Sequence, residues 1–416
     1  MISRLSIALL SIGIFFANLA SGDEMPKNPM ALLPDGSVMK GVLLPRYDEN
    51  RRLIGDLKAE ILTILDRQRI RGEDVLIRFY KEDGSEKGRV KMKNAIFDQQ
   101  RSLLKAVEPI EITNDNLIAR GTGLVYAFQE GKGFLRGPAS TRITPSEPVT
   151  SMRFDPMNHA ALFALCLAPS MIQAAPPDFV SKEELAAIQA EAESAKPRVE
   201  KINRSSAKIL ERDIATADAA KKDAVEFIKE GDIQTVATDE SETEEAKPLQ
   251  VEPGPNDTTI NCDGGMYFDA ENGILVYLKN VKVADPRFSL SGANELKVFF
   301  DKKEAADSEK KDGEKEGSIA PDASFGDVRK LVATGAVRIL QKGVDGKEPV
   351  EASGAILTYD VASGEIIVSG GYPWVKQGKF YARAKQPNLT LRLLTDGSFS
   401  TEGNWEMGGN LNLKNR

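Results

Sequence analysis

The chain has 416 residues, of which 41% are hydrophobic and 28% charged, and this length is enough for two or three domains with cores of their own. The net charge of −7, from 55 Lys and Arg against 62 Asp and Glu, argues against nucleic-acid binding, which needs a clustered basic surface. One histidine, His159, and two cysteines, Cys166 and Cys262, exclude a His-rich zinc site, a four-cysteine metal cluster and a disulfide scaffold.

Residues 1–22 have the pattern of a secretory signal peptide. Arg4 precedes a short apolar stretch, and Ala20-Ser21-Gly22 offers small residues for cleavage, as such peptides do. The alternative is an uncleaved membrane anchor, but the stretch is shorter than the ~20 apolar residues that a membrane span needs. Both interpretations export the rest of the chain.

Residues 31–150 are predicted to form a β domain. The segment 75–80 (Val-Leu-Ile-Arg-Phe-Tyr) is β-branched and aromatic, and a turn signal, Glu82-Asp-Gly-Ser85, follows it. Glycines then divide residues 121–137 into short apolar pieces, which is typical of strands joined by tight turns.

Residues 151–177 contain a second apolar stretch, from Ala160 to Ala175, that is too short for a membrane span and contains Pro169. With Met152-Arg153 before it and alanines at its end, it resembles an internal signal peptide, as a fusion of two secreted proteins would leave. A buried apolar linker is the equally supported alternative, since composition does not separate the two.

Residues 178–232 are predicted to be a helical hairpin. Ser181 to Glu184 reads as a capping box, apolar residues then recur at steps of three and four, Pro197 divides the segment, and Gly231 ends it. We expect a spacer that lies on a sheet. The alternative is a coiled-coil surface for a partner, but fewer than three clean heptads are present.

Residues 233–259 are polar, acidic and contain proline, so we expect a disordered acidic linker. Strands are predicted again over 260–416, interrupted by a charged loop at 302–322.

One hairpin pattern occurs three times, in Phe97–Leu103, Phe268–Ile274 and Tyr359–Ile366. Each has an aromatic residue, then aspartate, then a serine or glycine four positions on, then an aliphatic strand. We expect the aspartate side chain to cap the turn and the serine or glycine to take the backbone conformation that other residues avoid. The flanking strands alternate apolar and polar residues, which predicts a sandwich, a solenoid or a curved jelly roll.

These segments carry a family resemblance. Gly265–Val283, Leu331–Ile339 and Gly354–Gly370 resemble the repeat of the OstA-like (LptA/LptC-type) periplasmic proteins of lipopolysaccharide transport, and 41–142 is more similar to the LptC-type member. The resemblance implies a mainly β fold: two OstA-like β-jelly-roll (β-taco) units joined by the helical hairpin and the acidic linker. The helical segment, the linker and the 302–322 loop have no counterpart in simple members of the family.

The resemblance also implies a function. It predicts a non-enzymatic periplasmic protein without cofactor or metal that carries or bridges lipopolysaccharide, or a related anionic lipid, across the envelope to the outer membrane. Edge strands, such as Asn410–Asn415, would pair with other envelope β-jelly-roll proteins. The alternative is an envelope-assembly scaffold without lipid cargo, and a weaker third one is a glycan-binding or glycan-cleaving module. His159 follows no nucleophile pattern, so the sequence predicts no enzyme.

Two groups of candidate site residues follow, one from the resemblance and one from a local charge pattern, because Tyr372–Leu394 is basic and contains no acidic residue. Acyl chains would lie in an apolar groove, and which strand face lines it depends on a register that one residue can reverse. The groove candidates are Ile274, Val276, Val281, Val283, Phe288, Leu290, Leu296, Val298, Val337, Ile339, Ile366, Val368, Phe380 and Leu391. For each of them, ordinary core packing is the alternative. The candidates for contact with anionic head groups are Lys376, Lys379, Arg383, Lys385 and Arg392, with Trp374 and Tyr381 at the rim. The alternative interpretation of these basic residues is that they form a solvated strand face.

Overall fold

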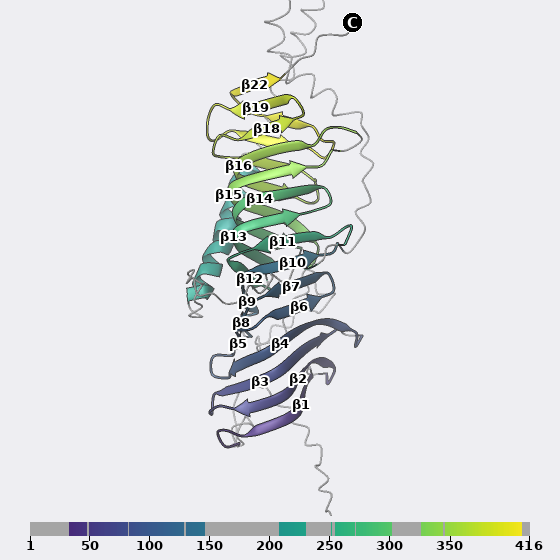
Figure 1. Ribbon diagram of the computed structural model, residues 1–416, viewed down its shortest axis with the longest axis vertical. Coiled ribbons are helices and arrows are strands. Elements are labelled where there is room, and N and C mark those ends of the chain that lie inside the picture. The colour runs from purple at the N-terminus through teal and green to yellow at the C-terminus, as the bar shows by residue number, and fades with distance from the viewer. Residues whose placement is uncertain are drawn as a thin grey trace, which may run out of the picture. The chain divides into compact units, whose positions relative to one another are not determined.

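The computed structural model describes residues 33–47, 50–81, 83–128, 130–145, 208–229, 251, 254–270, 272–301, 326–343 and 346–409. These residues form 22 strands and a helix at 208–229. Figure 1 draws them in the order of the chain from purple to yellow. The fold is therefore mainly β, as predicted. The predicted signal peptide, the 151–177 segment with Cys166, the first predicted helix, the 302–322 loop and Asn410–Asn415 lie outside the described residues. So does most of the predicted acidic linker, of which residues 251 and 254–259 are described. Among the described residues, the one helix is not apolar enough to cross a membrane.

The chain divides into two compact units, each built from three stretches of sequence. The first unit comprises 1–144, 224–278 and 300–327, and the second comprises 145–223, 279–299 and 328–416. One boundary falls inside the strand Ile274–Ala284, between Leu278 and Lys279. The domain boundaries that we derived from sequence stay predictions.

The first unit begins with four long antiparallel strands, each paired with the next. They are β1 (Val38–Tyr47), β2 (Leu53–Ile64), β3 (Arg69–Tyr80) and β4 (Glu86–Asp98). They lie side by side in Figure 1, coloured purple to blue. Positive φ angles of 63° at Gly41 in β1 and 48° at Asp74 in β3 mark sharp local turns of the backbone within these long strands.

The sheet divides at β4. Its residues 88–92 pair with β6 (Ile110–Asn114), and its residues 96–98 pair with β5 (Leu103–Ala106). Two walls follow from this division. The first wall continues through β8 (Leu124–Ala127), β9 (Lys132–Arg136), β12 (Gly265–Asp269) and β13 (Ile274–Ala284). The second continues through β7 (Leu117–Gly121), β10 (Ala139–Ile143) and β11 (Thr258–Cys262).

The chain crosses from one wall to the other through short connections. These connections join β5 to β6, β7 to β8, β9 to β10 and β11 to β12, each within a few residues. The walls touch near these connections. A Cβ atom at Gly121 would lie 2.5 Å from Cγ of Leu135, so the absence of a side chain at Gly121 lets Leu135 pack against the opposite wall. The side of the first unit that carries these connections is therefore closed by packing.

The three predicted hairpins are confirmed. In each, aspartate Oδ1 accepts a hydrogen bond from the backbone N–H three residues on, at 3.0 Å for Asp98, 2.9 Å for Asp269 and 3.0 Å for Asp360. The residue four positions after the aspartate has a positive φ, which is 50° at Ser102, 64° at Gly273 and 68° at Gly364. Local residue chemistry therefore determined these turns, as the sequence indicated.

The second unit divides in the same way. Its strands are β14 (Phe288–Phe300), β15 (Val328–Gln341), β16 (Val350–Asp360), β17 (Ile366–Ser369), β18 (Trp374–Gln377), β19 (Phe380–Ala384), β20 (Thr390–Leu393), β21 (Phe399–Thr401) and β22 (Trp405–Gly409). Strand β16 pairs with β17 through residues 356–359 and with β18 through residues 350–353. From there one branch runs through β20 to β21 and the other through β19 to β22.

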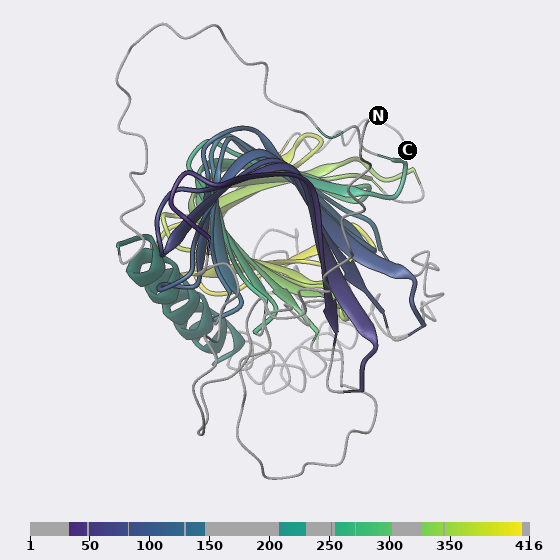
Figure 2. The same cartoon turned by 90° about the horizontal axis from the view of Figure 1, so that it is seen from below.

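Helix 208–229 packs with one face against strands. Its buried residues follow steps of three and four, and they are Leu210, Asp213, Ala217, Ala220, Ala224 and Phe227. In the second unit Lys330 Nζ lies 2.7 Å from Asp213 Oδ1, and Lys221 Nζ lies 2.6 Å from Glu295 Oε1. In the first unit the ring of Phe227 lies 5.7 Å from that of Tyr267. The helix, teal in Figure 2, lies within the segment predicted to be helical (178–232), while the predicted hairpin itself stays a prediction.

Cys262 in β11 is buried and forms no disulfide among the described residues. Burial raises the pKa of its thiol to about 11, so the thiol is protonated near neutral pH and unreactive.

Candidate functional site

Two rows of side chains cross the inner face of the first unit from β1 to β7. In a sheet, residues paired across adjacent strands lie on the same face. One row consists of Leu44, Leu57, Ile77, Val90, Ile112 and Ala119, and the other of Arg46, Gly55, Phe79, Gly88, Asn114 and Leu117, each paired with the next. The inner face of the four long strands is therefore continuous with that of the second wall.

The middle of these rows borders a cavity. Ile77, Val90 and Ile112 are apolar and face inward, yet they are only half-buried, because the space in front of them is not filled by other side chains. The cavity offers about 100 Å³ to water-sized molecules and is open to solvent.

The first wall supplies aromatic residues to the other side of the cavity. Tyr126 of β8 and Phe268 of β12 stack with 5.9 Å between ring centroids and 17° between ring planes. Gly133 of β9 pairs with both of them, and a Cβ atom there would lie 2.2 Å from Cζ of Phe268. The two rings can meet because the residue between them has no side chain. Phe128 contacts Tyr126 edge-on at 5.0 Å.

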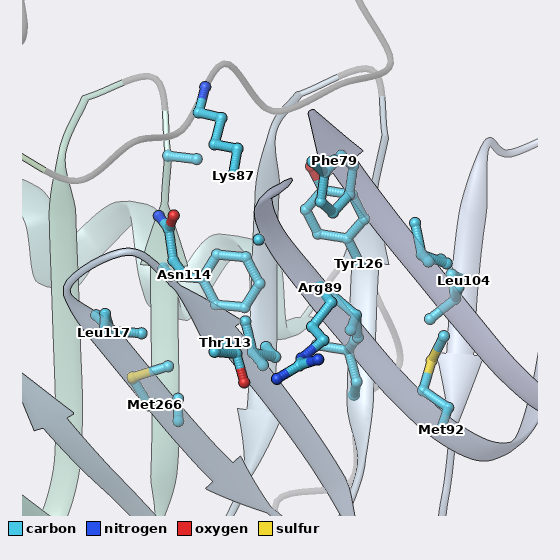
Figure 3. Close-up of a pocket in the computed structure, with 18 of the residues that line it drawn as sticks. Phe79, Lys87, Arg89, Met92, Leu104, Thr113, Asn114, Leu117, Tyr126 and Met266 are labelled. Carbon is cyan, nitrogen blue, oxygen red and sulfur yellow. The ribbon is translucent and has the colours of Figure 1, made fainter. Parts of the chain in front are cut away.

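Most of the residues around the cavity are apolar, as Figure 3 shows. The lining consists of Ile77, Phe79, Lys87, Gly88, Arg89, Val90, Met92, Leu104, Ile112, Thr113, Asn114, Leu117, Ala119, Leu124, Tyr126, Phe128, Met266, Phe268, Ala270 and Leu275.

The two charged side chains of this lining, Lys87 and Arg89, lie at its border. In Figure 3 the ammonium group of Lys87 points away from the other labelled side chains. Arg89 lies between the inward-facing Gly88 and Val90, so its side chain leaves the opposite face of the strand. It is exposed and forms an ion pair with Glu86 at 3.7 Å. An apolar site with polar groups at its border suits an amphiphile better than a polar metabolite.

None of the fourteen groove candidates lines this cavity. Twelve of them are buried, and Ile274 and Phe380 are half-buried. In β13 the structure resolves the register that the sequence left open. Leu275 pairs with Phe268 and lines the cavity, whereas Val276 pairs with Tyr267, which contacts the helix. Ile274 and Val276 therefore face away from the cavity.

In the second unit the structure brings several groove candidates together in its core. Val368 of β17 pairs with Leu391 of β20 and with Leu357 of β16, and Ile339 of β15 pairs with Ala352. All five are buried, at 1% exposure or less. A groove role for these residues remains a prediction.

The head-group candidates divide into two environments. Lys376, Lys379, Arg383 and Lys385 are exposed. Arg392 instead donates from Nη2 to both carboxylate oxygens of Glu365 at 2.6 Å, so its charge is compensated within the protein.

The two rim aromatics share a face with part of this basic group. Trp374 pairs with Arg383, and Lys376 pairs with Tyr381, across β18 and β19. The guanidinium of Arg338 lies over Trp374, 5.6 Å from the ring centroid, in cation–π geometry.

Sequence reasoning missed the cavity of the first unit. Two features of the sequence belong to this cavity: the alternation at Val75-Leu-Ile-Arg-Phe79 and the aromatic residue Phe268 of the second hairpin pattern. The lining is built from strands far apart in sequence, so no single segment displays it.

No protein-family model and no curated protein matches the chain. Among solved structures, the chain is similar to the crystal structure of LptH, the LptA homologous periplasmic component of the conserved lipopolysaccharide transport device from Pseudomonas aeruginosa. The identity is 15% and the TM-score 0.27, over 36% of this chain and 93% of that chain.

Proposed function

We propose that the protein binds an amphiphilic lipid and holds its acyl part in the cavity of the first unit. The observation that carries this proposal is the group of inward-facing but uncovered apolar side chains, Ile77, Val90 and Ile112. Uncovered apolar surface inside a protein is an energetic cost that an acyl chain removes, at roughly 0.8 kcal/mol for each methylene buried.

The proposed cargo is lipopolysaccharide or a related anionic lipid, carried or bridged through the periplasm to the outer membrane. This part rests on the OstA-like motifs of the sequence. Other envelope β-jelly-roll proteins would be partners through edge-strand pairing, which supplies main-chain hydrogen bonds between molecules.

The test fills the cavity without changing the outer surface. Ile112→Trp places a large side chain into the cavity. Ile118→Trp is the matched control, because Ile118 of β7 is also half-buried but pairs with Thr113 and Arg142, outside the two inward rows. Protein purified from the periplasm is extracted with organic solvent, and acylated lipid is measured by mass spectrometry per mole of protein.

We expect wild type and Ile118→Trp to carry equal amounts of lipid and Ile112→Trp to carry several-fold less. Equal lipid in both variants would contradict binding in this cavity. Lipid-free wild type that copurifies with a stable protein partner would favour the alternative function, an envelope-assembly scaffold of the same fold.

A further inference from the structure

Arg46 is the charged residue in the two inward rows. It lies in β1 opposite Gly55, which in turn pairs with Phe79 of the cavity lining. Arg46 is half-buried, whereas its neighbour Tyr47 is 54% exposed. Its pairing with Gly55, opposite Phe79, places Arg46 on the inner face.

The row leads from Arg46 to the cavity lining through Gly55, which has no side chain and pairs with Phe79. Arg46 therefore lies on the same face of the sheet as Phe79, next to the cavity rather than in its lining.

The charge of Arg46 is not neutralised by a carboxylate among the described residues, within which it forms no ion pair or side-chain hydrogen bond. Burial lowers the pKa of its guanidinium, and the nearby Tyr126 raises it by less. By contrast, Arg78 on the neighbouring β3 donates to both oxygens of Asp56, at 2.9 and 2.7 Å. A partly desolvated guanidinium is costly unless it is paired, and an anionic ligand would compensate its charge.

We propose that Arg46 binds the anionic group, a phosphate or a carboxylate, of the amphiphile whose acyl part occupies the cavity. This inference rests on the proposed function and adds the residue that recognises the anionic group of the ligand. The planar guanidinium can donate two parallel hydrogen bonds to either oxyanion.

The test separates head-group recognition from acyl binding. Dodecyl phosphate and dodecanol share one chain and differ in the charge of the head group. Each displaces a fluorescent apolar probe from the full-length protein, at concentrations below micelle formation, and inorganic phosphate alone is the third competitor. Arg46→Gln removes the positive charge. Arg46→Lys keeps the positive charge but loses the planar guanidinium that donates two parallel hydrogen bonds. Arg71→Gln is the matched control, because Arg71 is an exposed residue of β3 outside the inward rows.

We expect wild type and Arg71→Gln to bind dodecyl phosphate about 10-fold or more tighter than dodecanol, since a hydrogen bond to a charged group is worth that factor. Arg46→Gln should bind both ligands equally, with dodecanol affinity unchanged, and Arg46→Lys should keep part of the preference. Equal weakening of both ligands in Arg46→Gln, or displacement by inorganic phosphate alone, would overturn the inference. A wild type that binds neither amphiphile would instead refute the proposed function itself.

Discussion

Gly133 shows how one residue shapes the cavity. It separates Tyr126 and Phe268 in the pairing of the first wall, and the two rings meet above it. Aromatic pairs of this kind contribute about 0.5–1.5 kcal/mol beyond the area that they bury. A small residue at this position therefore fixes the orientation of two large ones.

We predict that Gly133→Ala destabilises the protein and weakens amphiphile binding, because the new Cβ atom would lie 2.2 Å from Cζ of Phe268 and force the ring into the cavity. Overpacking of a core costs typically 1–3 kcal/mol. The urea midpoint and the displacement assay measure the two effects. Adding Phe268→Leu makes room for the Cβ atom, so the double variant should recover part of the stability. Additive losses in the double variant would contradict a clash between these two residues.

At the scale of elements, helix 208–229 is held to the second unit by two ion pairs of different character. The pair between Lys330 and Asp213 is buried on both sides, and such a pair is costly to break by removing one partner. Glu295 is less buried and lies between two lysines. Its Oε2 accepts a hydrogen bond from Lys297 Nζ at 2.6 Å, and its Oε1 lies 2.6 Å from Lys221 Nζ.

Glu295 makes this attachment dependent on pH. Burial alone would raise the pKa of its carboxyl group, but hydrogen bonds from Lys221 and Lys297 outweigh burial and lower it. A carboxyl group whose pKa is lower in the folded than in the unfolded state stabilises the fold above its unfolded pKa, about 4.3, and loses this contribution as pH falls through the folded pKa.

We predict that Glu295→Gln reduces stability at pH 7 and flattens the loss of stability on acidification below about pH 5, in the window set by the lowered pKa. Urea midpoints of wild type and variant between pH 7 and pH 3 measure this difference, and the other carboxylates cancel in the comparison. Parallel curves for the two proteins would contradict a role for the Glu295 charge.

The elements differ in how far sequence could predict them. The three aspartate-capped hairpins follow from a few adjacent residues, so the pattern at Asp98, Asp269 and Asp360 predicted both the hydrogen bond and the positive φ. The helix was predicted from its large apolar residues, whereas much of its buried face consists of Ala217, Ala220 and Ala224. Small residues allow close approach to strands, but their burial depends on that contact and cannot be read from apolar spacing alone.

The strand faces could not be predicted, because pairing partners come from distant parts of the chain. In β13 the choice between Val276 and Leu275 depends on which of them lies beside Phe268. A shift of one residue exchanges the two faces. The sequence therefore predicted the fold class, while the position of the cavity required the strand pairing.

At the scale of the whole molecule, the sequence and the structure predict lipid binding in different units. The fourteen candidates from the sequence lie mostly in the second unit, and the cavity lies in the first. Hydrogen exchange with and without saturating dodecyl phosphate distinguishes these locations, since a ligand that binds only the folded state suppresses local opening around its site.

We predict that the ligand slows exchange in β3, β4, β6 and β8, which carry Ile77, Val90, Ile112 and Tyr126, and leaves β17 and β20 unchanged. Protection of β17 and β20 instead would place the ligand among Ile366, Val368 and Leu391, and would support the groove predicted from sequence. The Ile112→Trp variant is the control, because it should lose the protection in the first unit.

The apolar row from Leu44 to Ala119 crosses six consecutive strand positions. At a strand spacing of about 4.8 Å this gives a track of about 24 Å. Its first five members are aliphatic side chains of similar size, so a hydrocarbon tail can shift by one strand and exchange one set of contacts for a nearly equivalent set. For the lipid ligand that we propose, such a surface would accommodate tails of unequal length.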